Sequence, residues 1–322
     1  NGSTWTRRLP QSPPVMHHAM TYDSARHLIV LFGGSTRVGT TDTAVGETWE
    51  WNNQGWHLTP NTGPSARQHH AMAYDKSREV TVLFGGLVSD GSASRETWEY
   101  DGTTWLLKST GGPSARYQHA MTYDSARGVV VLFGGSNDGN ETWEWDGLSW
   151  QLRATTGPSA RAGQSLAFDS NRNVIVMFGG STGGNETWEW DGSTWSLRST
   201  SGPSSRSDYA MAYWPSRGVT ILQGGVNNGS KDDSWEWNGT SWINKSNLER
   251  ISTWGHAMVF DEQNDYLVLY GGLGTGSNGI RNGMTWILGP LDSDGDGLLD
   301  CQDQCETDPA KTASGACGCG VP

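Results

Sequence analysis

Short apolar runs recur along the chain, and each of them ends in a pair of glycines. VVVLF at 129–133 precedes the glycine pair 134–135, and VIVMF at 174–178 precedes the pair 179–180. Continuous β-branched runs of this kind are typical of strands covered on both faces. Six glycine pairs that follow such a run occur at intervals of 45 to 52 residues, at 33–34, 85–86, 134–135, 179–180, 224–225 and 271–272. A repeat of this length predicts stacked supersecondary units that share a core.

The third copy shows which strands make up one unit. Residues 118–123 alternate in polarity as a half-buried strand does, and 129–133 form an inner strand. Thr142-Trp-Glu-Trp145 places both indoles on one face, and the Asp-Gly turn that follows leads into a fourth strand centred on Trp150. Four short strands joined by turns describe a propeller blade. We therefore expect an all-β protein, a six-bladed β-propeller of four-stranded antiparallel blades.

The first and last copies are both incomplete. Residues 1–5, Asn-Gly-Ser-Thr-Trp, match the start of a fourth strand at 238–242. The sixth copy has candidate strands at 256–260, 266–270 and 284–288 but lacks a fourth. We predict that the N-terminal strand around Trp5 completes the last blade, which removes an exposed sheet edge and closes a propeller domain over residues 1–290.

These repeats resemble those of the kelch family, which carry a Gly-Gly pair after the second strand and a spaced aromatic residue in the third. The resemblance covers residues 1 to about 288 and implies a propeller that holds ligand on one loop face. The chain departs from the family pattern in its Trp-Glu-Trp segments and in Gln223, which replaces the aromatic residue before the fifth glycine pair.

Two sets of repeated side chains are candidates for function. The first lies on the innermost strand: His18, His70, His119 and His256, with Ser165 and Tyr209 in the other two blades. These residues could form a metal-binding ring around the central channel. Because such a ring would be wide and two blades lack the histidine, we favour a structural role in which each imidazole bonds the backbone of its own blade.

The second set lies in the loops that lead from one blade to the next: Arg67, Arg116, Arg161 and Arg206. These loops share a face with the connections between second and third strands, which vary most in length, and binding residues concentrate on such loops. Arginine recognises carboxylate or sulfate in a bidentate way, so this face could bind a glycan or a peptide. A structural salt bridge to a neighbouring blade is the alternative, and the sequence leaves the two open.

Catalytic patterns are missing from the repeats. There is no nucleophile elbow, no HExxH and no phosphate-binding loop, and the propeller region has no cysteine for the Cys-Tyr cofactor of kelch-bladed copper oxidases. One carboxylate recurs at the same place in most blades, which marks architecture: Glu50, Glu99, Glu144, Glu189 and Glu236. We therefore predict that the chain is not an enzyme.

The last 32 residues, 291–322, form a separate acidic tail. Asp292, Asp294, Asp296, Asp300 and Asp303 occupy positions 1, 3, 5, 9 and 12 of a twelve-residue loop, with Gly297 at position 6 and the Leu298 carbonyl at position 7. Oxygen ligands at this spacing predict bound Ca²⁺. With Cys301 and Cys305, the segment resembles a thrombospondin type 3 repeat over residues 292–305, which implies an extracellular, calcium-rigidified connector.

The tail also holds all four cysteines: Cys301, Cys305, Cys317 and Cys319. We expect disulfides, whose pairing stays open, over a zinc site, because the acidic neighbours suit a hard cation and the Cys-x-Cys spacing fits zinc poorly. A tail of this size has too small a core to be rigid alone. We expect it to dock on the propeller or on another copy, and docking between copies would generate a ring or a filament.

Charge and hydropathy limit the partners. The formal net charge is −12, which argues against nucleic acid and anionic membranes. Apolar runs of only four or five residues exclude a transmembrane span, and the polar start shows no leader pattern, so the numbering is expected to begin at a processed end or inside a precursor. The sequence thus predicts an extracellular or cell-surface structural and interaction protein that self-assembles through its tail, with a glycan- or peptide-binding propeller module as the alternative.

Overall fold

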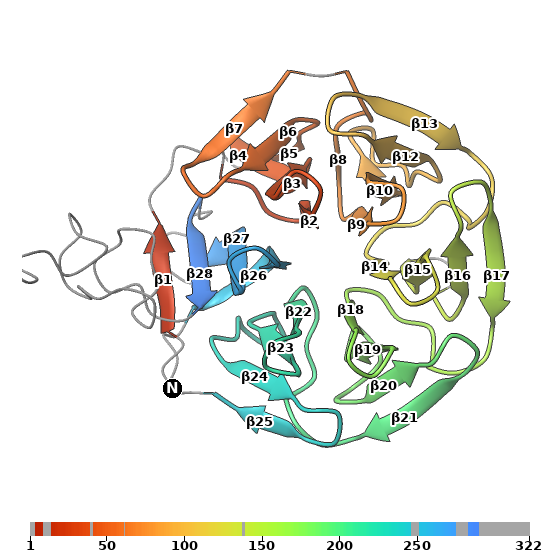
Figure 1. The fold of residues 1–322 in the computed structure, drawn as a ribbon, viewed down its shortest axis with the longest axis vertical. Coiled ribbons are helices and arrows are strands. Elements are labelled where there is room, and N and C mark those ends of the chain that lie inside the picture. Colours follow the sequence, from red (N-terminus) through yellow and green to blue (C-terminus); the bar gives the residue numbers. More distant parts are fainter. Residues whose placement is uncertain are drawn as a thin grey trace, which may run out of the picture.

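In the computed structural model of the protein, six four-stranded antiparallel sheets are arranged around a central axis (Figure 1). The structure describes residues 4–8, 14–38, 41–60, 62–136, 139–245, 251–274 and 283–289. Throughout these segments the regular structure is β-strand, which confirms the predicted all-β, six-bladed propeller. The calcium loop, the four cysteines and the proposed boundary at residue 290 lie outside the described residues.

In blades 1 to 5 the four strands follow the order of the chain from the axis outwards, and in blade 6 the N-terminal strand takes the outermost place. Blade 1 consists of β2 (Ala19–Asp23), β3 (Leu28–Phe32), β6 (Thr48–Trp51) and β7 (Trp56–Thr59). Blade 2 consists of β9 (Ala71–Asp75), β10 (Val80–Phe84), β12 (Thr97–Tyr100) and β13 (Trp105–Ser109). Blade 3 consists of β14 (Ala120–Asp124), β15 (Val129–Phe133), β16 (Thr142–Trp145) and β17 (Trp150–Ala154). Blade 4 consists of β18 (Ser165–Asp169), β19 (Val174–Phe178), β20 (Thr187–Trp190) and β21 (Trp195–Ser199). Blade 5 consists of β22 (Ala210–Trp214), β23 (Val219–Gln223), β24 (Ser234–Trp237) and β25 (Trp242–Asn244). Blade 6 consists of β26 (Thr253–Asp261), β27 (Tyr266–Gly274), β28 (Thr285–Gly289) and β1 (Thr4–Arg8).

Blade 6 is closed by the N-terminal strand, as predicted. Strand β1 pairs antiparallel with β28, with Trp5 opposite Leu288. The Trp5 side chain is 2% exposed and packs in a cluster with Leu267, Leu269 and Leu288. The two ends of the propeller are therefore joined by backbone pairing and by a buried indole.

The hydrophobic core lies between neighbouring blades. One cluster, for example, joins Val82 and Phe84 of blade 2 to Val130, Leu132 and Trp145 of blade 3. Each blade thus buries its apolar face only against the next, as expected for stacked repeats. Among the described residues, no helix is long and apolar enough to cross a membrane.

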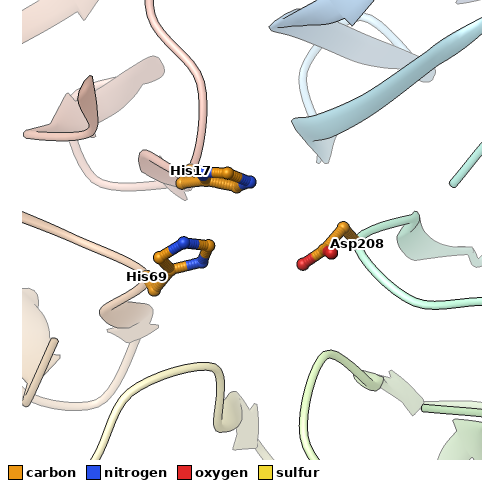
Figure 2. Close-up of side chains that lie close together, drawn as sticks. All are labelled: His17, His69 and Asp208. Carbon is orange, nitrogen blue, oxygen red and sulfur yellow. The ribbon is translucent and has the colours of Figure 1, made fainter. Parts of the chain in front are cut away.

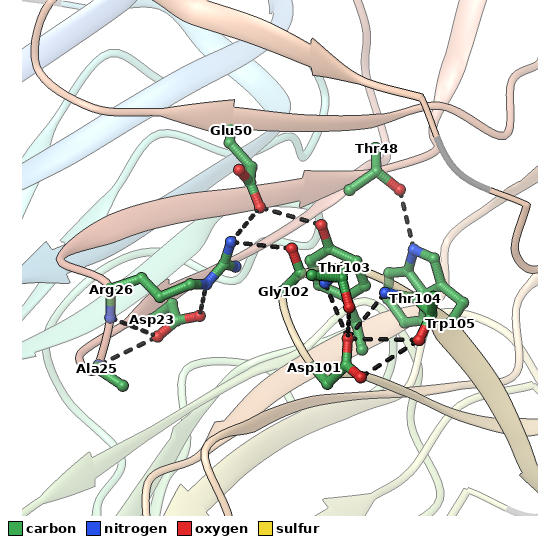
Figure 3. Close-up of polar contacts among 11 residues, drawn as sticks. Asp23, Ala25, Arg26, Thr48, Glu50, Asp101, Gly102, Thr103, Thr104 and Trp105 are labelled. Atoms are coloured by element: carbon green, nitrogen blue, oxygen red, sulfur yellow. Dashed lines mark hydrogen bonds and ion pairs between the residues drawn. The ribbon is translucent and has the colours of Figure 1, made fainter.

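The repeated tryptophans link these neighbours by hydrogen bonds. The indole Nε1 at the start of the fourth strand donates to a threonine hydroxyl on the third strand of the preceding blade: Trp105 to Thr48 at 2.9 Å, with the same bond from Trp56, Trp150, Trp195 and Trp242 (Figure 3). This contact explains why the fourth strand begins with tryptophan, since a buried indole N–H requires an acceptor.

A second link uses the once-per-blade glutamates. Arg26, in the turn after β2, donates to Asp23 at 2.7 Å, to Glu50 at 2.7 Å and to the Gly102 carbonyl of the next blade at 3.3 Å (Figure 3). Equivalent ion pairs hold the remaining members of the series, Glu99, Glu144, Glu189 and Glu236. The interpretation of these carboxylates as architecture is confirmed.

Candidate functional site

The four loop arginines are buried and paired. Arg67, Arg116, Arg161 and Arg206 are 0–2% exposed. Arg67 donates to the Gly85 carbonyl at 3.0 Å and to Glu96 at 2.6 Å, while its own backbone carbonyl accepts from Gly34 N–H of the preceding blade. The other three make the same set of bonds with Glu141, Glu186 and Asp233.

This placement corrects the ligand-binding interpretation of these arginines. Their guanidinium groups face a glycine carbonyl and a carboxylate inside the protein, so they offer no donors to a ligand on the surface. Of the two alternatives that the sequence left open, the geometry supports the salt bridge. The arginines join neighbouring blades at the glycine pair.

The repeated histidines form a buried ring, hereafter the polar ring, of His18, His70, His119, Gln164, Tyr209 and His256. Gln164, and not Ser165, occupies the fourth position, because its amide reaches the first glycine of the pair as the imidazoles do. Gln164 Nε2 donates to the Phe133 carbonyl at 2.8 Å, and Tyr209 Oη donates to the Phe178 carbonyl. Both acceptors belong to the preceding blade, so at these two positions the polar ring bonds a neighbouring blade and not, as the sequence predicted, its own.

Burial favours the neutral form of the histidines in the polar ring. Burial, with Arg116 nearby, lowers the pKa of His119 to about 3, and burial alone is the main cause that lowers the pKa of His256 to about 3. The rings of His18, His70 and His119 pack edge-on against aromatic residues of the preceding blade, as His119 does on Phe84 at 5.4 Å between centroids. The polar ring therefore belongs to the packing between blades.

The residue before each member of the polar ring lies close to the axis. Together these six residues form the rim, defined as His17, His69, Gln118, Gly163, Asp208 and Gly255. The N–H of each rim residue donates to the carbonyl of the rim residue in the preceding blade, over 2.7 to 3.1 Å, and the six bonds close into a circle. All six residues have positive φ, between 53° and 70°. The circle fixes their positions through the backbone and leaves the side chains free to differ.

Side chains of the rim meet over the axis. Figure 2 shows His17 and His69 on one side and Asp208 facing them from the other. The two imidazoles stack with centroids 3.7 Å apart, and one ligand atom from each of the three residues lies within 4.8 Å of the other two. Burial lowers the pKa of His69 to about 4 and raises the pKa of Asp208.

An aromatic arc extends along half of the rim. Trp254 lies 5.6 Å from His17, and Tyr117 lies 6.3 Å from His69, measured between ring centroids. Trp254, His17, His69 and Tyr117 thus form a continuous row over four neighbouring blades, and Asp208 faces this row.

A cavity of about 130 Å³ lies between the rim and the polar ring, and a chamber of about 500 Å³ continues along the axis beyond the polar ring. The smaller one, hereafter the rim cavity, is lined by residues of the rim and of the polar ring, among which Asp208 is the one carboxylate and no Lys or Arg occurs.

The rim opens on the face that carries the variable connections, hereafter the loop face. Ser35 N–H donates to the Met16 carbonyl, and Ser136 N–H donates to the Tyr117 carbonyl, so each connection starts beside a rim segment. Blade 1 adds the hairpin β4 (Ser35–Val38) and β5 (Thr41–Ala44), and blade 2 adds the short pair β8 (Arg67–Gln68) and β11 (Leu87–Val88).

Comparisons with known proteins support the fold. The chain is similar to the solved structure of YjhT, with a TM-score of 0.70 and 13% sequence identity, over 88% of this chain and 97% of that one. At this identity the likeness shows the propeller fold alone. No protein-family model and no curated protein matches the chain.

The sequence contained a signal for the rim that the register argument missed. His17-His18 and His69-His70 are doublets, and only the second histidine of each belongs to the repeated pattern. Aligning the six copies on that second residue shows a different residue type before it in most blades. A variable position beside one that is histidine in four of the six copies marks the candidate site.

Proposed function

We propose that the chain is a non-enzymatic, kelch-type extracellular interaction module that binds a neutral glycan at the rim, on the loop face. The observation that carries this proposal is the contrast between the rim and the rest of the repeat. Arginines, glutamates, tryptophans and the polar ring serve contacts between blades, whereas the rim side chains vary from blade to blade and line an opening.

The aromatic arc supports a sugar ligand. A sugar ring presents an apolar C–H face, which packs on amphipathic aromatic rings such as those of Trp254 and Tyr117. The Asp208 carboxylate can accept hydrogen bonds from hydroxyl groups, and the Gln118 amide can both accept and donate them. A few such polar groups suffice to fix the orientation of a ligand.

Charge favours a neutral ligand over an acidic one. The rim cavity has no Lys or Arg among the residues that line it, and Asp208 repels carboxylate and sulfate. The whole chain carries a net charge of −12, which adds to this repulsion at long range.

Binding to an array of neutral and acidic oligosaccharides tests the proposal. We expect capture of neutral glycans by the wild-type protein and loss of capture in Trp254→Ala and Asp208→Asn. Leu148→Ala is the matched control, because Leu148 is 88% exposed in the turn between β16 and β17, away from the rim. Capture that is unchanged in both rim variants, or capture of peptides only, would overturn the proposal.

Self-association through the tail is the second candidate function. It rests on the calcium-type loop at 292–303 and on the acidic character of the segment around it. Sedimentation of the full chain with Ca²⁺ and with chelator tests it: a larger species that appears only with Ca²⁺ supports assembly, and a monomer in both conditions removes the idea.

A further inference from the structure

His17, His69 and Asp208 bring together the donor set of a transition-metal site. Two imidazole nitrogens and one carboxylate oxygen are ligands that Zn²⁺ and Fe²⁺ accept. One such atom from each residue lies within 4.8 Å of the others (Figure 2). In a tetrahedral zinc site the ligand atoms lie about 3.4 Å from one another. Side-chain rotations that move these three ligand atoms by about 1 Å would therefore allow all of them to bind one ion.

The backbone fixes these three residues independently of any ion. Each is held by the circle of rim hydrogen bonds, in which His69 N–H donates to the His17 carbonyl at 2.9 Å and Asp208 N–H donates to the Gly163 carbonyl at 3.1 Å. A site whose ligands are positioned beforehand loses less entropy when it binds.

The surroundings of the three side chains also suit a cation. Among the residues that the structure describes, no Lys or Arg lines the rim cavity, and Asp208 supplies a negative charge that is partly withdrawn from solvent. Ser207 Oγ lies 3.3 Å from Asp208 Oδ2, and the Gln118 side chain hydrogen-bonds the same carboxylate. Groups of this kind orient a carboxylate that binds a metal.

We infer that the rim holds one divalent first-row transition-metal ion, bound by His17, His69 and Asp208. Three protein ligands leave at least one coordination position open toward the axis, where water or a donor atom of a ligand would complete the shell. The inference concerns the same opening as the proposed glycan site and does not depend on it.

Titration with Zn²⁺ and Co²⁺ tests the inference on the full chain. Excess Ca²⁺ is present to occupy the acidic tail, and any free thiols are alkylated so that no thiolate competes. Calorimetry with Zn²⁺ gives the stoichiometry, and the visible absorption of bound Co²⁺ reports nitrogen and oxygen ligands in a site with an open position.

The variants are chosen from the repeat itself. His69→Gln introduces the residue that blade 3 carries at the equivalent position, where Gln118 has the same backbone conformation at φ 56°. Asp208→Asn keeps the shape of the side chain. The matched control is His27→Asn, which removes an exposed histidine with φ 56° from the turn after β2 and copies Asn173 of blade 4.

We expect one Zn²⁺ per wild-type chain, at least tenfold weaker binding in His69→Gln and Asp208→Asn, and unchanged binding in His27→Asn. Absence of binding by the wild-type protein, or equal binding by all four proteins, would overturn the inference. Two results would distinguish this inference from the proposed function. One is a Trp254→Ala protein that binds Zn²⁺ but no glycan, and the other is a wild-type protein that binds either Zn²⁺ or the glycan but not both.

Discussion

Replacing His119 by Gln is the sharpest test of how the polar ring contributes to stability. His119 is 5% exposed and lies against Phe84, with Arg116 nearby. Blade 4 already carries Gln164 at this position, where the amide bonds the Phe133 carbonyl at 2.8 Å. His119→Gln therefore substitutes one native solution of the repeat for another and removes one titratable group.

The expected effect depends on pH. Burial lowers the pKa of His119 to about 3 in the folded protein, whereas the unfolded imidazole has its ordinary pKa of 6.5. The folded state holds the neutral form, so its stability is fully present above pH 6.5 and is lost as the pH falls towards 3. At pH 5 the difference of 1.5 pH units corresponds to about 2 kcal/mol of unfolding free energy.

Guanidinium unfolding followed by tryptophan fluorescence at pH 7.5 and pH 5.0 measures this loss. We expect the two proteins to differ by less than about 1 kcal/mol at pH 7.5, and wild type to lose about 2 kcal/mol more than His119→Gln at pH 5.0. His256→Gln, in the blade on the far side of the axis, repeats the test (Figure 1). Equal losses in wild type and variants would refute the burial of neutral imidazoles.

Three further predictions concern the closure of the ring, the arginines and the tail. Trp5→Ala should lower the free energy of unfolding by about 3–5 kcal/mol, and deletion of residues 1–9 should leave the outer edge of β28 unpaired and cause association that light scattering detects. Arg116→Met should cost about 2 kcal/mol, because Glu141 and the Gly134 carbonyl lose their donor, and should leave glycan capture unchanged. Asp294→Asn combined with Asp296→Asn should abolish Ca²⁺ binding measured by calorimetry and leave the melting temperature of the propeller within a few degrees.

The strands were predictable because the same hydrophobic pattern occurs six times. The inner strand at 129–133 has the predicted limits, and the pairing of Trp5 with blade 6 followed from the incomplete first and last copies. The first strand of blade 3 begins at Ala120 and not at residue 118, because Gln118 has positive φ and belongs to the rim. Alternating polarity cannot show where a strand gives way to such a crossing.

The candidate site was harder to predict, because burial and backbone conformation are not visible in the pattern. Arg67 is a charged residue in a loop, which suggests exposure, yet it is fully buried between a carbonyl and a carboxylate. His17 and His69 each precede a repeated histidine by one residue. The repeated histidine packs between blades, whereas the residue before it lies in the rim. Only the positions of the backbone decide which histidine of each doublet faces the axis.

The rim shows why side chains can vary at the centre of a regular repeat. Its six hydrogen bonds run between backbone groups, so the fold does not depend on which side chain a rim position carries. Positive φ costs a residue other than glycine roughly 1 kcal/mol, and Gly163 and Gly255 avoid this cost. His17, His69, Gln118 and Asp208 accept it in the same circle. Since glycine would serve the backbone at least as well, the backbone does not explain the four side chains, which are the ones that the proposed metal and glycan sites use.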